Sequence, residues 1–336
     1  MKTKRITSLI LALALALSLC LTGCGSQGGD TQEPAGDNNT AGDDAKYTVG
    51  ICQLVQHEAL DAATQGFIDA LNEALPGQVK IVEKNASGDS INCSTIVNGF
   101  VSDGVDLIMA NATPALTAAA SATSDIPILG TSITAYGVAL DMEDFDGTVG
   151  GNISGTSDLA DLEKQAAMIT EWFPEAKKVA LLFCSAEPNS RYQIEEVAKH
   201  LADAGIETEE FAFTDTNDVA SVAQAACEYA DVVYIPTDNT AAANTEAIAN
   251  VLIPAGVPAI CGEEGLCSGC GVATLSIDYH QLGEVTGEMA YDILVKGADP
   301  ATMEIKYAPD TTKMYNADIC QELGITPPDG YTAIEA

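Results

Sequence analysis

The chain contains two copies of one α/β pattern, and this repeat narrows the choice of fold more than any single motif. Residues Asp106–Ala115 match Asp231–Thr240 without a gap. Further on, Ile126–Leu129 is echoed by Val257–Ile260, and both segments have proline in second place. The copies lie about 125–131 residues apart, so the pattern is a twofold duplication and not a solenoid.

Each copy alternates short apolar runs with segments of helical periodicity. Val49–Leu54 is typical of a buried strand, and apolar residues then recur at helical spacing from Leu60 to Leu75. The alternation continues in segments 79–83, 90–101, 105–110, 126–129, 178–184, 190–204 and 206–213. This order predicts parallel sheets with helices on both faces. The predicted fold class is α/β, with two Rossmann-like lobes joined by a hinge.

Two such lobes indicate where a ligand would bind. In open parallel sheets, ligands bind beyond the carboxyl ends of the strands. Two lobes that face each other across a hinge form a cleft that can close over a small molecule. Helix N-termini would point into this cleft, and their unpaired N–H groups suit a carboxylate or a phosphate.

The first 46 residues have a different character. A basic start precedes an apolar stretch from Ile6 to Leu21, which is short for a membrane span and has no stop-transfer pattern after it. We interpret residues 1–23 as a signal peptide. Residues 24–46 are rich in Gly, Asp, Asn and Thr without apolar periodicity, so they are expected to form a disordered linker.

The predicted signal peptide and the residue after it give Leu21-Thr22-Gly23-Cys24, which resembles the lipobox of bacterial lipoproteins. The resemblance implies cleavage before Cys24, a lipid such as palmitate on its thiol, and anchoring to the outer face of the cell membrane. An ordinary signal peptide with an incidental cysteine is the alternative. On either interpretation, the rest of the chain works outside the cytoplasm.

The acidic composition excludes some partners. The formal net charge is −35 over 336 residues, and three of the 14 basic residues lie in the signal peptide. The mature chain is therefore more acidic still and repels nucleic acids and anionic lipid headgroups. No nucleic-acid partner is expected, and the membrane is reached only through the lipid on Cys24.

Eight cysteines follow Cys24, and four of them occur in apolar strand or helix patterns, namely Cys52, Cys184, Cys227 and Cys261. A free cysteine behaves there as a small hydrophobic residue, so mostly free thiols are expected. The spacing Cys261-x5-Cys267-x2-Cys270 could instead serve a metal, a disulfide or a redox pair. Because no matching Cys or His pair stands nearby, we predict no metal site.

Catalytic motifs are missing from the sequence. The three histidines are far apart, and no Gly-x-Ser-x-Gly elbow, phosphate-binding loop or His-Glu-x-x-His motif occurs. His57, near a helix start, is more typical of a local hydrogen-bonding group than of a catalyst. We therefore expect neither an enzyme nor a cofactor.

A series of short motifs covers nearly the whole chain after residue 46, namely Gln56–Asp61, Gly66–Leu71, Ala112–Ala115, Gly151–Asp158, Pro236–Thr240 and Gly271–Thr274. In this order they resemble the ABC-transporter substrate-binding family that includes tryptophan-, tyrosine- and phenylalanine-binding proteins. The resemblance implies the type I periplasmic-binding-protein fold. The chain departs from the family pattern at Gly130–Tyr136, where a Thr-Asp-Pro-like turn is usual, and at Cys267–Cys270, which is expected to form an insert-like turn.

The resemblance also implies an organisation and a function. Residues 47–156 with 278–305 would form lobe 1, and residues 157–277 with 306–336 would form lobe 2 or a segment near the hinge. A monomeric receptor would capture a small solute, by resemblance an aromatic amino acid, and deliver it to a permease with a separate ATPase. The alternatives are another amino acid, a nucleoside or an organic anion as ligand, a signalling partner, or a thiol-redox protein using Cys267 and Cys270.

Position and resemblance together indicate ligand-binding candidates in the first lobe. Thr113 and the N–H of Ala115 would hold a ligand carboxylate, although Thr113 is also expected to cap its helix. Gln53 is polar at the end of an apolar strand, which favours the cleft over the core. The loop after the fourth strand adds two hydroxyl donors and an aromatic wall, namely Ser132, Thr134 and Tyr136.

Further candidates lie on the second lobe and the hinge. Asp238 is stabilised at a helix N-terminus and could pair with a ligand ammonium, with capping as the alternative. Asn239 beside it can donate and accept hydrogen bonds. Asn189 holds the place of Gln53 in the second copy, where N-capping explains it nearly as well. Ser157, on the first crossover, would contact the ligand or only the hinge.

Overall fold

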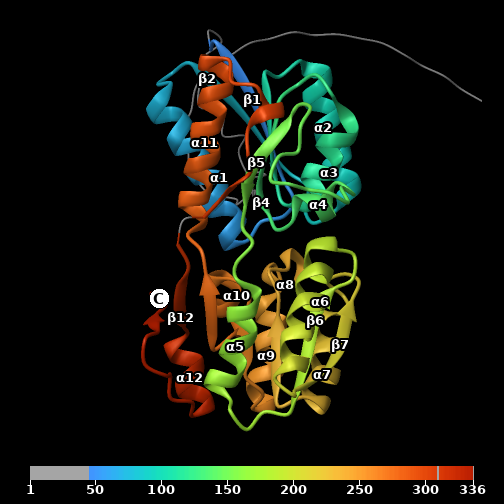
Figure 1. Cartoon of the computed structure of the whole chain (residues 1–336), viewed down its shortest axis with the longest axis vertical. Coiled ribbons are helices and arrows are strands. Elements are labelled where there is room, and N and C mark those ends of the chain that lie inside the picture. The colour runs from blue at the N-terminus through green and yellow to red at the C-terminus, as the bar shows by residue number, and fades with distance from the viewer. Residues whose placement is uncertain (1–44, 309, 336) are drawn as a thin grey trace, which may run out of the picture. The chain divides into compact units, whose positions relative to one another are not determined.

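The computed structural model describes residues 45–308 and 310–335, which form two lobes, each built on one sheet with helices on both faces (Figure 1). The first sheet has six parallel strands in the order β11-β5-β4-β3-β1-β2. These strands are β1 (Tyr47–Gln53), β2 (Val79–Asn85), β3 (Leu107–Asn111), β4 (Ile128–Ile133), β5 (Ile153–Ser157) and β11 (Lys306–Tyr307).

Two pairs of helices cover the first sheet. One face packs against α1 (Glu58–Ala74) and α11 (Tyr279–Lys296), and the other packs against α2 (Ser90–Asp103) and α3 (Thr113–Ala122). Successive side chains of β1 point to opposite faces of the sheet. Val49 and Ile51 pack in the core under α1 and α11, and Cys52 packs in the core under α2 and α3. The short α4 (Tyr136–Ala139) and the 3-10 turn η1 (Pro300–Thr302) complete the lobe.

The second sheet has seven strands in the order β13-β12-β10-β9-β8-β6-β7, and only the β10–β12 pair is antiparallel. The strands are β6 (Lys178–Cys184), β7 (Glu207–Phe213), β8 (Val232–Ile235), β9 (Ala259–Cys261), β10 (Ala273–Ser276), β12 (Thr312–Tyr315) and β13 (Thr332–Ala333). The helices are α5 (Leu162–Trp172), α6 (Pro188–Asp203), α7 (Val219–Tyr229), α8 (Asn239–Ala242), α9 (Thr245–Ala255), α10 (Glu264–Cys270) and α12 (Ala317–Leu323).

The chain passes between the lobes three times. It leaves the first sheet after β5, returns from β10 into α11, and leaves again between β11 and β12. The sequence assigned residues 306–336 to lobe 2 or to a segment near the hinge, and Lys306 and Tyr307 pair with Thr156 and Ser157 of β5. The third crossover therefore begins after residue 307, because this segment first completes the edge of the first sheet.

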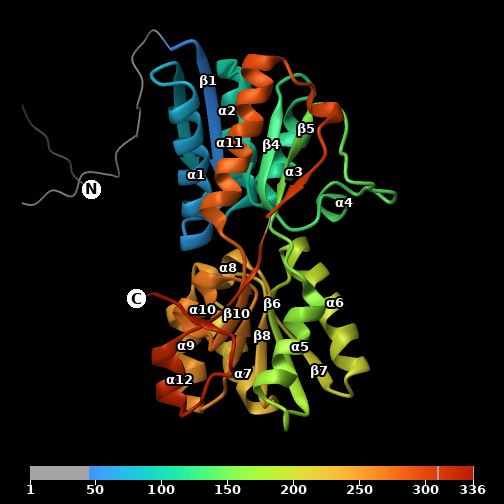
Figure 2. The same ribbon diagram turned by 60° about the vertical axis from the view of Figure 1, so that its left-hand side comes forward.

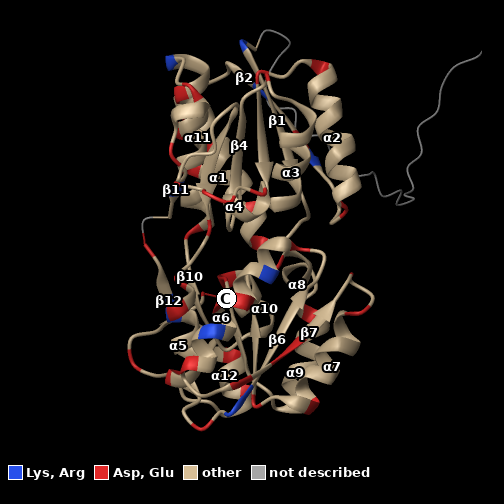
Figure 3. Cartoon of the chain, turned by 45° about the vertical axis from the view of Figure 1, so that its right-hand side comes forward, with Lys and Arg blue, Asp and Glu red and all other residues tan. Residues whose placement is uncertain are grey.

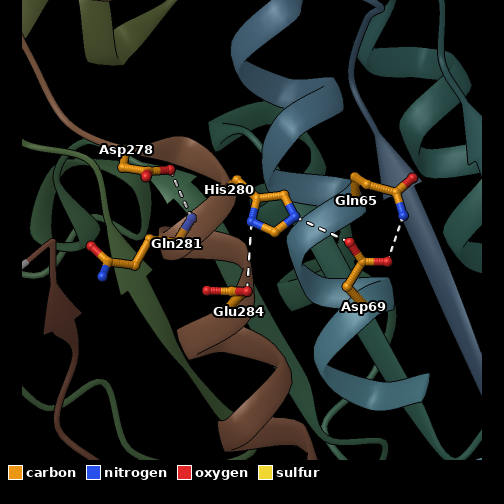
Figure 4. Close-up of polar contacts among 6 residues, drawn as sticks. All are labelled: Gln65, Asp69, Asp278, His280, Gln281 and Glu284. Atoms are coloured by element: carbon orange, nitrogen blue, oxygen red, sulfur yellow. Dashed lines mark hydrogen bonds and ion pairs between the residues drawn. The ribbon is translucent and has the colours of Figure 1, made fainter. Parts of the chain in front are cut away.

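Helices α1 and α11 lie side by side although about 200 residues separate them, as Figure 2 shows. Their contact is very close, since a Cβ on Gly66 would overlap the carbonyl oxygen of His280, and one on Gly283 would overlap that of Ala63. At the exposed rim of this contact, His280 Nε2 lies 3.1 Å from Asp69 Oδ2 (Figure 4). The contact fixes α11 to the first lobe.

The Cys267–Cys270 segment, which the sequence predicted to be a turn, is the end of helix α10. All eight cysteines in the described part of the chain are free, as expected from their apolar surroundings. Within those same residues, no helix is both long and apolar enough to cross a bilayer.

Candidate functional site

A cavity of about 380 Å³ lies between the two lobes, at the carboxyl ends of their strands. The first lobe contributes the loop after β2 and Pro114 at the start of α3. The second contributes the loops after β6 and β7 together with α8, and these include Glu187, Asn239 and Thr240. The cavity lies beyond the strand ends, where the sequence predicts a site, and of the predicted residues only Asn239 lines it.

The start of α3 differs from the sequence-based expectation. Thr113 is the first helical residue and not the cap, because Ala112 occupies the N-cap position without a side-chain hydrogen bond. Ala112 has φ +86°, an unusual conformation for a residue with a side chain. The N–H of Ala115 donates to the carbonyl of Ala112, so it is already used within the turn. Thr113 is buried, and its carbonyl accepts from the Thr117 hydroxyl one turn along the helix.

The three ligand-binding residues predicted around the end of β4, Ser132, Thr134 and Tyr136, lie in three different environments. Ser132 lies in a bulge of the β4–β5 pairing with φ +54°, and its buried Oγ has no hydrogen-bond partner. Thr134 is buried near the hinge, where its carbonyl accepts from the Ser157 hydroxyl. Tyr136 packs in the core, and its hydroxyl donates to the carbonyls of Gly130 and Thr156. Its ring is therefore not presented as a wall of the cavity.

Gln53 lies at the predicted strand end, but its side chain lies under α1. Its Nε2 donates to Asp61 Oδ1 at 2.6 Å and to the carbonyl of Val55 at 2.9 Å, while its Oε1 accepts from Thr64 at 2.6 Å. It is 2% exposed. Both ends of the amide are thus used to hold the first turns of α1 against the strand.

Asp238 acts as a cap in this structure. Its Oδ1 accepts from the N–H of Ala241, and its Oδ2 accepts from the N–H of Cys184 at 2.6 Å. The carboxylate therefore ties the start of α8 to the end of β6. Burial, reinforced by the nearby charge of Glu187, raises the pKa of Asp238 to about 8. Neither oxygen is left open for the ligand ammonium that the sequence suggested.

Glu187, which the sequence did not single out, organises the second-lobe side of the cavity. Its carboxylate accepts from the backbone N–H groups of Asn239 and Thr240, from the Asn239 amide at 2.7 Å, and from the Thr240 hydroxyl at 2.8 Å. It occupies the N-cap position of α6, so Asn189 lies within the first turn and does not cap the helix. The Asn189 amide donates to Thr237 O at 3.1 Å, and its buried Oδ1 has no partner.

Asn239 forms a hydrogen bond between the lobes. Its Oδ1 lies 3.2 Å from Nε2 of His57, which precedes α1. Because the Asn239 amide nitrogen donates to Glu187, its oxygen must be the atom that accepts from His57. Desolvation lowers the pKa of His57, although this hydrogen bond and nearby carboxylates oppose the effect. His57 therefore donates as a neutral imidazole near pH 7.

The first crossover places two polar residues at the hinge. The Ser157 hydroxyl donates to Thr134 O at 3.0 Å and accepts from the N–H of Leu159, so it shapes the crossover. Asp158 follows it, and its Oδ2 accepts from the Tyr279 hydroxyl at 3.1 Å, across to the second crossover. Asp158 was not predicted, although it directly follows a strand of small polar residues. Its Oδ1 has no partner.

The sequence left open whether Cys261, Cys267 and Cys270 serve a metal, a disulfide or a redox pair. All three thiols are buried in one core cluster of the second lobe. Burial raises the pKa of Cys267 well above its ordinary value, which disfavours the thiolate that redox chemistry requires. In residues 45–308 and 310–335, no group of three or more His, Cys, Asp or Glu is arranged to hold a metal ion.

Acidic residues occur over both lobes, and basic residues are fewer (Figure 3). Of the acidic residues, Asp158, Glu187, Asp238 and Glu263 are buried. All four lie near strand ends or crossovers, where the lobes meet. The junction is thus rich in buried carboxyl groups, and the buried residues of the described chain include no Lys, Arg or His.

Comparisons with known proteins agree with this architecture. The family model for ABC transporter substrate binding proteins matches residues 48–333. The tyrosine-binding protein of Clostridioides difficile (strain R20291) is 33% identical over 329 residues, which are 96% of this chain and 93% of that protein.

Two solved structures are similar over 86% of this chain at 32% identity. One is an ABC domain from Streptococcus pneumonia in complex with L-Trp, which is covered completely with a TM-score of 0.82. The other is the ligand-free, open structure of a substrate binding protein with adhesive properties from Clostridium difficile, covered to 99% with a TM-score of 0.66. The chain belongs to the family of ABC transporter substrate-binding proteins and has their two-lobed, type I periplasmic fold.

Proposed function

We propose that the chain is an extracytoplasmic receptor that holds an aromatic amino acid between its lobes and delivers it to an ABC permease with a separate ATPase. One observation carries the proposal: the buried polar atoms without a partner include Ser132 Oγ near the end of β4, Asp158 Oδ1 directly after β5 and Asn189 Oδ1 in the first turn of α6. They come from the first lobe, the crossover and the second lobe. Since an unpaired buried polar group costs about 1–3 kcal/mol, a ligand that supplies partners would stabilise the closed lobes.

The ligand class is drawn from the relatives. One similar protein binds tyrosine by name, and one similar structure contains L-Trp. Both ligands carry a carboxylate, an ammonium and an aromatic ring. The hydroxyls of Thr113 and Ser132 suit the carboxylate, while the open oxygens of Asp158 and Asn189 suit an N–H donor.

The arrangement of the lobes gives independent support. The two solved relatives have the same identity to this chain, yet the L-Trp complex gives the higher TM-score, 0.82 against 0.66. Because the two identities are equal, sequence divergence does not account for the difference in TM-score. A difference between closed and open lobes would account for it. The hydrogen bond between His57 and Asn239 agrees with a closed form. An empty closed form would leave the ligand's partners buried and unpaired, as Ser132, Asp158 and Asn189 are.

A thermal-shift screen tests the proposed ligand. The purified protein is melted with each amino acid, with nucleosides and with small organic anions. Tyrosine, tryptophan or phenylalanine should raise the melting temperature, because a ligand at 100 times its Kd adds about 2.7 kcal/mol of stability. If only a different solute raises the melting temperature, the proposal of an aromatic ligand is wrong. If no solute raises it, the proposed receptor function is contradicted.

We further propose that Cys24 carries the lipid anchor. Cys24 lies outside the described residues, and the proposal rests on the lipobox-like sequence before it. A Cys24→Ala variant should move from the membrane fraction to the medium and should no longer incorporate a labelled palmitate analogue. An unchanged membrane fraction for this variant would contradict the anchor.

A further inference from the structure

We propose that Asp158 recognises a cationic nitrogen of the ligand, so that the site selects solutes that carry an ammonium group. This inference rests on the proposed function, because it assigns a role within the same site between the lobes. It begins with the contrast between Asp158 and the other buried carboxylates.

Three of the four buried acidic side chains have no oxygen to spare. Each of the three has both carboxylate oxygens bonded to donors at the start of a short helix or, for one oxygen of Asp238, at the end of β6. Glu187 accepts from Asn239 and Thr240, Asp238 accepts from Cys184 and Ala241, and Glu263 accepts from Gly265 and Leu266. These carboxylates are structural caps.

Asp158 is different. It is 4% exposed, and its Oδ2 accepts from the hydroxyl of Tyr279. Its Oδ1 has no partner, and the buried polar and charged residues of the described chain include no Lys, Arg or His. Burial, as the largest cause, raises the pKa of Asp158 to about 6, so the ionised form lacks a compensating charge. A cation brought by a ligand would supply it.

The surroundings of Asp158 favour an organic ammonium over a metal ion. Calcium and magnesium need about six or more oxygen ligands, and most of these are usually carboxylates, carbonyls or water. The groups around Asp158 are instead hydroxyls, those of Thr134 and Tyr279, which act on the carboxylate as hydrogen-bond donors. One open carboxylate oxygen provides one charge-assisted hydrogen bond to an ammonium, which has three donors to distribute.

The position of Asp158 links cation binding to the hinge. Asp158 directly follows β5 on the first crossover, and Tyr279 opens α11 after the second crossover. Their hydrogen bond therefore joins two of the three connections between the lobes. A cation at Oδ1 favours the ionised carboxylate, which accepts more strongly from Tyr279. Ligand binding is thereby coupled to the geometry of the crossovers.

The first test uses the unaltered protein and ligands that lack the amine. Calorimetric titration at pH 7.5 compares tyrosine with 3-(4-hydroxyphenyl)propanoate, and tryptophan with 3-(indol-3-yl)propanoate. Each amino acid should bind at least about 30-fold more tightly than its des-amino analogue, as expected for a desolvated charge pair. If the screen identifies another amino acid, that amino acid and its des-amino analogue are compared in the same way.

The second test removes the charge but keeps the shape. Asp158→Asn retains an oxygen for the Tyr279 hydroxyl, and it should weaken amino-acid binding at least about 30-fold while changing des-amino binding less than about threefold. Asp161→Asn is the matched control, because it removes one charge three residues away at an exposed helix cap. It should bind amino acids within about threefold of the unaltered protein.

The outcomes separate this inference from the receptor proposal. If Asp158→Asn binds the amino acid as tightly as Asp161→Asn, the inference is overturned and the receptor stands. The inference is also overturned, with the receptor proposal intact, if the unaltered protein binds a des-amino analogue within about threefold of its amino acid. This result does not depend on the folding of any variant. A screen in which the only bound solute carries no cationic nitrogen would overturn the inference in the same way. If no screened solute binds, both proposals fail.

Discussion

Buried carboxylates are the most unusual side chains where the lobes meet. Burial raises the pKa of Asp158 to about 6, that of Glu263 to about 7 and that of Asp238 to about 8. In each case loss of hydration is the largest cause, and Glu58 of the facing lobe adds to the effect at Glu263. The folded protein therefore binds protons at these residues more tightly than the unfolded chain does.

This difference predicts how stability depends on pH. An acid with a raised folded-state pKa stabilises the fold while it remains protonated, and that contribution is lost as the pH rises through the folded-state value. The free energy of unfolding should therefore fall between pH 6.5 and 8.5, where Glu263 and Asp238 ionise. His57 opposes the trend only at lower pH, because its pKa is depressed.

Glu263→Gln isolates one of these groups. Urea denaturation at pH 6.5 and 8.5 should show a loss of stability in this variant about 1 kcal/mol smaller than in the unaltered protein. The exposed Glu196→Gln should leave the loss unchanged, since Glu196 pairs only with Lys199 at the surface. Equal pH dependence in Glu263→Gln and the unaltered protein would show that Glu263 does not ionise in this range.

Single side chains at the site were only partly predictable. Ser157 and Asn189 were predicted, whereas their neighbours Asp158 and Glu187 were not. With 49 acidic residues in the chain, sequence cannot tell a buried carboxylate from a solvated one. Gln53 was expected in the cleft because it is polar at a strand end, but its amide bonds to Asp61 and Thr64 under α1.

The α1–α11 contact is the packing feature on which the first lobe depends most clearly. Gly283→Ala should lower the free energy of unfolding by about 1–3 kcal/mol, because its Cβ would overlap the carbonyl of Ala63 and push the helices apart. Gly99→Ala is the control, since Gly99 is exposed on α2 with open space around it. It should raise stability by about 0.5–1 kcal/mol. Chemical denaturation measures both, and equal effects would contradict the close contact.

Elements with long apolar runs were predictable from sequence, and short ones were not. The strands around Val49 and Val179 stand out because they are buried on both faces. Strand β5 was missed, since Ile-Ser-Gly-Thr-Ser has no apolar run, and β11 and β13 have two residues each. The start of α3 was misplaced by one residue, because Ala112 adopts a positive φ that no local pattern indicates.

The two lobes are the pair of similar α/β units that the internal repeat predicted. The repeat indicates two similar α/β units, and the structure has two sheets whose strand ends contribute to one cavity. The hydrogen bonds that cross between the lobes could not be predicted in this way. His57 meets Asn239, and Asp158 meets Tyr279, only because loops of different copies lie opposite each other.

The most direct measurement is a crystal structure of the protein with the amino acid that gives the largest thermal shift. The ligand should lie between the lobes, with its amine within hydrogen-bonding distance of Asp158 Oδ1 and with Ser132 and Asn189 paired to it or to ordered water. A ligand bound outside the space between the lobes, or one that leaves all three side chains unpaired, would contradict the account.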